Sequence, residues 1–205
     1  MRIQPLPLLV LIAAALLLGG CGTPRFVQNA VVQAAPPEGK AIINVYAQSI
    51  DSWPVFLEGK TLVAAPKGYT VTQIVVEPGD HTLLLRYDVK DRAAAITVST
   101  TANHIYDVMA DSSLAWGSGD SYLSWGKFGR YLYLKPVMPT GEDRDTLTKK
   151  MGKYSAITID RSDQKVAQME QEYAADNAAV LVEFRAGKKI DDAVLQILTA
   201  DQFRH

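Results

Sequence analysis

Apolar and polar residues alternate along several short stretches in the middle of the chain. The clearest of these stretches is His81–Val89. One set of alternate positions there is apolar: Leu83, Leu85, Tyr87 and Val89. The positions between them are mixed: Thr82, Leu84, Arg86 and Asp88. Because successive side chains of a strand point to opposite faces of a sheet, this period of two residues predicts a half-buried β-strand.

Seven other stretches are rich in β-branched and aromatic residues, which favour strands. They are Ala41–Tyr46, Val55–Leu57, Thr61–Val63, Tyr69–Val76, Ala95–Thr100, His104–Met109 and Arg130–Val137. Between them, Glu58-Gly59-Lys60 predicts a tight hairpin and Pro78-Gly79-Asp80 predicts a second turn. We expect a positive φ at both glycines. Short strands separated by turns predict an antiparallel β-sandwich.

Prolines and a charged run near residue 140 indicate a boundary after these strands. Beyond it, the pattern predicts four elements in the order β-α-β-α. They are a strand at Tyr154–Ile159, a helix from Ser162 or Asp163 to Asn177, a strand at Ala179–Phe184 and a helix from Asp191. The first helix has an apolar face that we expect to pack on a sheet: Val166, Met169, Tyr173 and Ala174. The predicted fold class is therefore mainly β with an α+β extension.

Two motifs resemble the PEGA-type β-sandwich modules of bacterial envelope lipoproteins. Residues 55–62, VFLEGKTL, are similar to the hairpin V-x-L/I-D-G-x-x-V, with Glu58 where aspartate is usual. Residues 76–83, VEPGDHTL, are similar to the turn and strand v-x-P-G-x-H-x-L. The resemblance covers Ile42 to Met109 and implies a sandwich that serves as a structural or binding appendage without catalytic residues. We expect the ring of His81 to bond nearby backbone.

The N-terminus carries an apolar run and the only cysteine of the chain. The run, Leu8–Leu18, is too short for a bilayer span of about 20 residues and is typical of a signal peptide. It leads into Leu18-Gly19-Gly20-Cys21, which resembles the lipobox of bacterial lipoproteins. The resemblance implies cleavage before Cys21, which then carries lipid, palmitate included, as a permanent anchor. Gly22, where aspartate would favour the inner membrane, indicates the outer membrane and the periplasm.

These patterns divide the chain into four segments: a lipoprotein signal peptide at 1–20, a tether at 21–40, the β-sandwich at 41–137 and an α/β extension at 138–205. The 205 residues include 21 Lys and Arg against 22 Asp and Glu, a balance that argues against a nucleic-acid partner. One cysteine and three histidines argue against a multi-cysteine or multi-histidine metal centre. We therefore expect no metal and no cofactor.

Residues 112–130 mix glycine and serine with large aromatic side chains. The four that form the candidate binding surface are Trp116, Tyr122, Trp125 and Phe128. Exposed aromatics in such a frame can stack on sugars, contact another protein or enter a membrane interface. The alternative is a long hairpin loop whose aromatic side chains fold back over the open end of the sandwich.

We expect a non-enzymatic envelope lipoprotein that binds or scaffolds a protein or a glycan. Two alternatives stay open: a lipoprotein subunit of a secretion or transport assembly, and an esterase. Gly119-Asp120-Ser121-Tyr122 resembles the nucleophile block of GDSL-type esterases, with Asp201 and His205 as triad partners. That family places its serine near the start of an α/β domain and spaces the downstream pair D-x-x-H. This chain departs on both counts, so we expect no catalytic residues.

Overall fold

The computed structural model describes residues 26–28, 30–49, 54–65, 68–86, 93–114, 130–186 and 197–198. Within these ranges the chain is mainly β, with two sheets and two α-helices. The strands are β1 (Phe26–Gln28), β2 (Ala41–Ser49), β3 (Val55–Leu57), β4 (Thr61–Ala64), β5 (Gly68–Val76), β6 (Gly79–Arg86), β7 (Ala93–Thr100), β8 (Ile105–Leu114), β9 (Arg130–Pro136), β10 (Ser155–Ile159) and β11 (Ile197–Leu198). The helices are α2 (Glu142–Lys150), the short 3₁₀ helix η1 (Met151–Lys153) and α3 (Gln164–Arg185).

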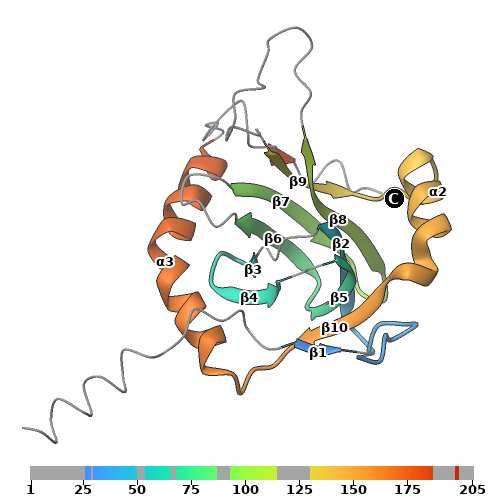
Figure 1. Ribbon diagram of the computed structural model, residues 1–205, viewed down its shortest axis with the longest axis horizontal. Helices are drawn as coiled ribbons and strands as arrows, with labels where there is room; N and C mark the ends of the chain where they lie inside the picture. Colours follow the sequence, from blue (N-terminus) through green and yellow to red (C-terminus); the bar gives the residue numbers. More distant parts are fainter. Residues whose placement is uncertain are drawn as a thin grey trace, which may run out of the picture.

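The strands form two sheets that pack face to face (Figure 1). Sheet A has the order β1-β10-β5-β2-β8-β9, and sheet B has the order β11-β7-β6-β3-β4. Most neighbours are antiparallel, whereas β2 with β8, β5 with β10 and β7 with β11 are parallel. A parallel pair needs a long crossover connection. Between β2 and β8 the chain twice crosses into sheet B and back, which supplies that crossover.

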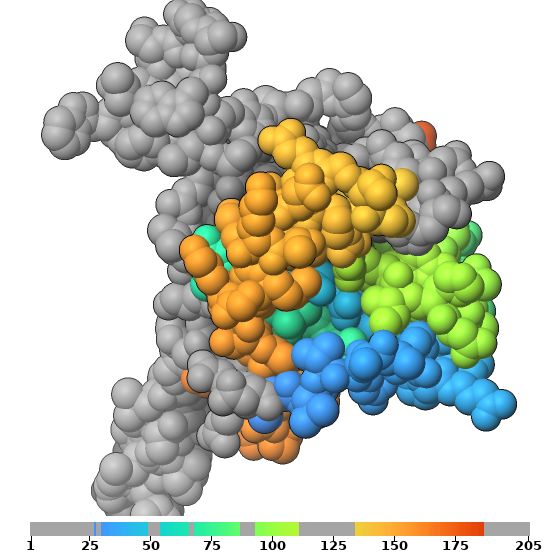
Figure 2. Space-filling view, turned by 90° about the vertical axis from the view of Figure 1, so that its right-hand side faces the viewer, coloured from blue at the N-terminus to red at the C-terminus, as the bar shows by residue number. Residues whose placement is uncertain are grey.

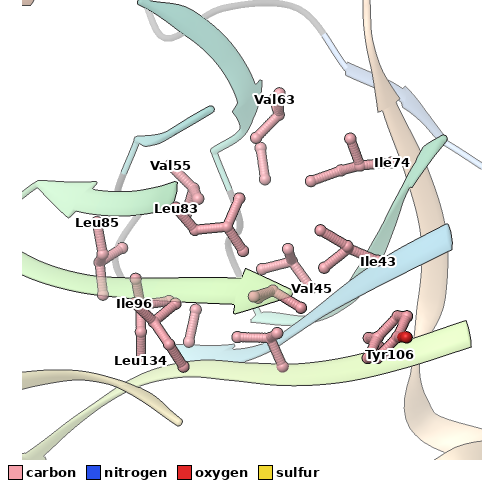
Figure 3. Close-up of a cluster of buried hydrophobic side chains, with 14 of the residues drawn as sticks. Ile43, Val45, Val55, Val63, Ile74, Leu83, Leu85, Ile96, Tyr106 and Leu134 are labelled. Atoms are coloured by element: carbon pink, nitrogen blue, oxygen red, sulfur yellow. The ribbon is translucent and has the colours of Figure 1, made fainter. Parts of the chain in front are cut away.

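The inner faces of the two sheets bury one apolar cluster (Figure 3). β6 contributes Leu83 and Leu85, which meet Ile43 and Val45 of β2 and Ile96 of β7. The alternation predicted for this strand is confirmed over the described part, because Leu84 belongs to a different cluster on the outer face of sheet B. Strand β6 is buried on both faces rather than half-buried as predicted, because Thr82, Leu84 and Arg86 on its outer side are buried too.

The two helices cover opposite outer faces of the sandwich (Figure 1). Helix α3 packs Val166 and Val180 against Phe56 and Leu84 of sheet B. Its N-cap is Asp163, whose side chain accepts a hydrogen bond from the backbone N–H of Lys165 at 3.0 Å. Helix α2 packs on sheet A through fully buried Leu147, beside apolar side chains of β2, β5 and β8.

The predicted strand at Ala179–Phe184 is wrong, because α3 continues through these residues to Arg185. The residues beyond Asn177 keep the helical spacing, with Val180 and Leu181 buried and Phe184 packed on the same cluster. That burial overrides the strand preference of β-branched residues. The helix predicted from Asp191 lies outside the described residues except at Ile197–Leu198, where it is wrong, because these residues form strand β11 beside β7. Helix α2 forms where the charged run indicated only a boundary.

Strands from three of the four predicted segments meet in sheet A. β10, from the predicted α/β extension, is hydrogen-bonded between β1 and β5. β1 comes from the predicted tether and pairs Val27 with Thr158. Among the described residues, the C-terminal segment thus contributes β10 to sheet A, β11 to sheet B and both α-helices to the outer faces.

The predicted hairpin between β3 and β4 is confirmed. Glu58 and Gly59 have φ values of 54° and 67°, and the N–H of Lys60 donates to the carbonyl of Leu57 at 3.1 Å. The turn lies under α3, where Asn177 Nδ2 donates to the carbonyl of Gly59 at 2.9 Å. A Cβ at Gly59 would lie 2.5 Å from Leu181 Cδ1. The second turn is confirmed as well, with a φ of 142° at Gly79.

Replacing Gly59 with alanine should therefore destabilise the protein more than the same change at Gly39. Gly39 has a comparable φ of 74°, but a Cβ added there would have nothing within 4 Å. We expect Gly39→Ala to lower the free energy of unfolding by about 1–2 kcal/mol through left-handed strain, and Gly59→Ala by ~1–3 kcal/mol more through overpacking. Urea unfolding of both variants measures the difference. Equal midpoints would contradict the packing of α3 on this turn.

Candidate functional site

The residues predicted to carry function lie largely outside the described residues. These are Cys21, the four members of the candidate binding surface (Trp116, Tyr122, Trp125 and Phe128) and the esterase alternative (Ser121, Asp201 and His205). Their flanks are described, since β8 and β9 pair up to Leu114 opposite Arg130. The local contact predicted for His81 is confirmed, with its Nε2 at 2.7 Å from the carbonyl oxygen of Glu77.

The outer face of sheet A, seen in Figure 2, carries a row of polar side chains across three strands. Asn44 of β2 is paired with Gln73 of β5 on one side and with Asp107 of β8 on the other. Asn44 Nδ2 donates to Asp107 Oδ1 at 2.8 Å, and Gln73 Nε2 donates to Asn44 Oδ1 at 3.1 Å. Together with Arg144 of α2, these residues form what we call the polar row.

Arg144 connects the polar row to the end of β9. Its Nη1 donates to Asp107 Oδ2 at 2.7 Å, and its Nε and Nη2 donate to the carbonyls of Met138 and Val137, each at 3.0 Å. Both carboxylate oxygens of Asp107 are therefore occupied, and its charge faces a guanidinium. The side chains of Arg144 and Asp107 are only 24% and 13% exposed, so water screens this ion pair weakly.

The other end of the polar row holds the chain that precedes β2. The N–H of Gln33 donates to Gln73 Oε1 at 2.8 Å, and Gln73 Nε2 donates to the carbonyl of Gln33 at 3.1 Å. One side-chain amide thus binds both backbone groups of a residue, as a neighbouring strand would. Residues near 33 are consequently fixed over the outer face of sheet A, beside β5.

A cluster of tyrosines and lysines lies next to the polar row, around the end of α2 and η1. Tyr154 contacts the rings of Tyr46 and Tyr69 edge-on, with centroids 5.2 and 5.5 Å apart. The ammonium groups of Lys150 and Lys153 lie 6.0 and 5.8 Å from the Tyr69 ring centroid, within cation–π range.

Burial raises the pKa of Tyr46 to about 12, and the Asp107 carboxylate adds to the rise. The Tyr46 phenol therefore stays protonated at neutral pH. Gln48 joins this cluster to the helix, since its Nε2 donates to Tyr154 Oη at 2.7 Å and its Oε1 accepts from Lys150 at 2.9 Å.

The chemistry of this face is that of hydrogen bonding, ion pairing and ring contact. No group of three or more metal-ligating side chains occurs within the described ranges. Helices long and apolar enough to cross a membrane are likewise absent from the part of the chain that the structure describes. The side chains of this face hold α2 and the segment near Gln33 in place.

Sequence reasoning missed the polar row, although a signal for it exists. Asn44 interrupts the otherwise apolar run Ile42–Tyr46, and Asp107 follows Tyr106 in the strand with which that run pairs. A polar side chain within a buried strand needs a partner. Which residue is the partner depends on how the two strands are aligned, and neither segment alone reveals that alignment.

Comparison with protein-family models and with curated proteins gives no significant match for this chain.

Removing the Asp107 carboxylate should destabilise the protein. Asp107→Ala leaves the guanidinium of Arg144 and the amide of Asn44 without their shared acceptor, which we expect to lower the free energy of unfolding by about 1–3 kcal/mol. The matched control is Asp143→Ala, which removes an exposed ion pair with Lys135 and should change stability by less than about 1 kcal/mol. Urea unfolding of both variants measures these values. Equal effects would contradict a structural role for the polar row.

Proposed function

We propose that the protein is a lipoprotein of the bacterial outer membrane that faces the periplasm. In this proposal the sandwich is a non-enzymatic binding or scaffolding module of the cell envelope. The observation that carries it is the sequence Leu18-Gly19-Gly20-Cys21 after an apolar run of signal-peptide length. Cys21 is also the only cysteine of the chain, as expected when the thiol is used for lipid attachment.

The position of β1 supports a folded domain that lies close to its lipid anchor. Phe26, the first residue of β1, follows Cys21 by five positions. Five extended residues span at most ~18 Å, so a lipid on Cys21 would keep the edge of sheet A near the bilayer. The turns at Gly59 and Gly79, both at positive φ, support the proposed relation to PEGA-type modules, whose motifs contain these glycines.

We propose the segment between β8 and β9 as the surface that binds the partner, a glycan or an envelope protein. Its four large aromatics can stack on sugar rings or pack on a protein surface. The described flanks give it a fixed base, because β8 and β9 are paired over seven residue pairs up to Leu114 and Arg130.

Cys21→Ser tests the anchor. A hydroxyl does not replace the thiol that accepts lipid, so the variant should accumulate as unprocessed precursor in its host cell. Metabolic labelling with radioactive palmitate, followed by gel electrophoresis, measures the result. The wild-type chain should carry the label and Cys21→Ser should not. Labelling of the variant at the wild-type level would refute the lipoprotein proposal.

Trp116 and Trp125 should be accessible to water if their segment is the binding surface. In a Trp53→Phe background only these two tryptophans remain, and we expect iodide to quench their fluorescence strongly. Changing both to alanine should then alter the free energy of unfolding by less than about 1 kcal/mol. Weak quenching together with a loss of about 3–5 kcal/mol would mean that they cover the core instead.

A further inference from the structure

Two lysines share one tyrosine ring at one end of the outer face of sheet A. Lys150 is the last residue of α2, and Lys153 is the last residue of η1. The ammonium nitrogens of both lie within 6.0 Å of the Tyr69 ring centroid, close enough for cation–π contacts. We call Lys150, Lys153 and Tyr69 the lysine cluster. In Figure 2 the gold and orange chain of α2 and η1 lies at the surface of this face.

The strands beneath the lysine cluster position its members. Tyr69 of β5 is paired with Gln48 of β2, and Gln48 Oε1 accepts a hydrogen bond from Lys150 Nζ at 2.9 Å. Tyr154 directly follows Lys153 and contacts the Tyr69 ring edge-on. The Tyr154 hydroxyl in turn accepts a hydrogen bond from Gln48 Nε2. The two lysines are therefore brought together by β2, β5 and the start of β10.

Within the part of the chain that the structure describes, no carboxylate lies within ion-pair distance of Lys150 or Lys153. Lys135 of β9, by contrast, pairs with Asp143. The negative end of the α2 dipole accounts for a cation at Lys150, but Lys153 lies beyond the end of that helix. Two ammonium groups beside one ring repel each other, and an anion bound between them would relieve that repulsion.

The lysine cluster lies at the end of sheet A from which the segment between β8 and β9 leaves. Gln48 pairs with Tyr69 near the end of β2, and the preceding Ala47 pairs with Ala110 of β8. Strand β8 continues in the same direction to Leu114. The segment proposed to bind the partner therefore starts from the end of the sheet that carries the lysine cluster.

The chain enters the sandwich nearer the opposite end of sheet A. Through the register of β10 and β5, Gln28 of β1 is level with Val45 of β2. Because β1 runs parallel to β2, Phe26 lies nearer the start of β2, and the residues that lead back to Cys21 leave in that direction. A lipid on Cys21 would therefore hold the lysine cluster away from the anchoring bilayer.

The chemistry and the position of the lysine cluster favour a glycan over other partners. Lysine is depleted in protein–protein interfaces, which argues against a protein at this place. The bilayer that would hold Cys21 lies toward the other end of the sheet. A sugar polymer with carboxylates can bind the ammonium groups, and the aromatic side chains of the adjoining segment can stack on its sugar rings.

We propose that the lysine cluster binds the carboxylates of an acidic glycan of the cell envelope. This inference rests on the proposed function, which it deepens by naming the class of partner. The ammonium groups of Lys150 and Lys153 donate hydrogen bonds to the carboxylates, and the Tyr69 ring keeps the two ammonium groups together. Because these charges are near the surface, salt should weaken the binding.

The test is isothermal titration of the full lipidated protein, in an uncharged polyoxyethylene detergent, with a tetramer of galacturonic acid. The methyl ester of the same tetramer is the matched ligand without charge. A tetraglutamate peptide is the matched anion without sugar, and glycerol phosphate represents a lipid head group. The double variant Lys150→Gln/Lys153→Gln removes both charges of the cluster. The control Lys60→Gln/Lys165→Gln removes the same charge beside and within α3, on the other side of the sandwich.

We expect the acidic tetramer to bind in low salt and the cluster variant to bind it about tenfold more weakly or worse, because charge-assisted hydrogen bonds are lost. The ester, the peptide and glycerol phosphate should bind the wild-type protein much more weakly than the tetramer does. The control variant should bind like the wild type. Urea unfolding checks that the cluster variant is folded, and Lys153→Gln alone, at an exposed position, gives the same comparison if it is not.

Several results would refute the glycan proposal. An equal loss in the control variant would mean that overall charge, rather than the cluster, attracts the tetramer. Equally tight binding of the peptide would indicate an acidic protein partner, and equally tight binding of glycerol phosphate would indicate a lipid head group. Binding of the ester as tight as that of the acid would mean that the lysines do not contribute.

Palmitate labelling of the same preparation reports the anchor separately. A protein without label that binds the tetramer through the cluster would refute the anchor alone. A labelled protein that does not bind the tetramer would refute the acidic glycan alone.

Discussion

The central strands of this sandwich are largely buried on both faces, so each sheet must be covered on its outside as well as packed against the other. β6 illustrates the constraint, with Leu83 and Leu85 between the sheets and Leu84 under α3. Burying one such side chain contributes about 1.5–3 kcal/mol. Helix α3 is therefore part of the fold, and the bond from Asn177 to Gly59 fixes it to the hairpin turn.

Sheet A meets the same constraint with a shorter helix. α2 has nine residues, about 14 Å of length at 1.5 Å per residue, and Leu147 is its only buried residue. It covers the half of the outer face that holds Tyr46, Val71 and Met109. The polar row begins where α2 no longer covers the sheet. At this boundary Arg144 of α2 binds Asp107 and two carbonyls of the chain after β9. Beyond that row the outer face holds Ile42, Val75 and Ile105.

Strands and turns were predictable because they depend on local pattern: alternation in β6, and the glycines of the two turns. The strand predicted at Ala179–Phe184 failed because Val180 and Leu181 satisfy both a strand preference and a helical spacing, and only contact with Gly59 and sheet B decides between them. Helix α2 was missed because one buried leucine gives no periodicity. The polar row depends on the register of three strands, which no single segment encodes.

The register of sheet A also places the entry of the chain at β1 and the segment between β8 and β9 at opposite ends of the sheet. β8 runs parallel to β2, and Ala47 pairs with Ala110, so Leu114 lies beyond the end of β2 that is distant from Ile42. The residues between β8 and β9 therefore leave the sheet opposite the end at which Phe26 enters it. With a lipid on Cys21 in the bilayer, the segment that carries Trp116 and Trp125 would start at the end of the sheet away from the anchor. A partner in the periplasmic space then fits this geometry better than the lipid surface that holds Cys21.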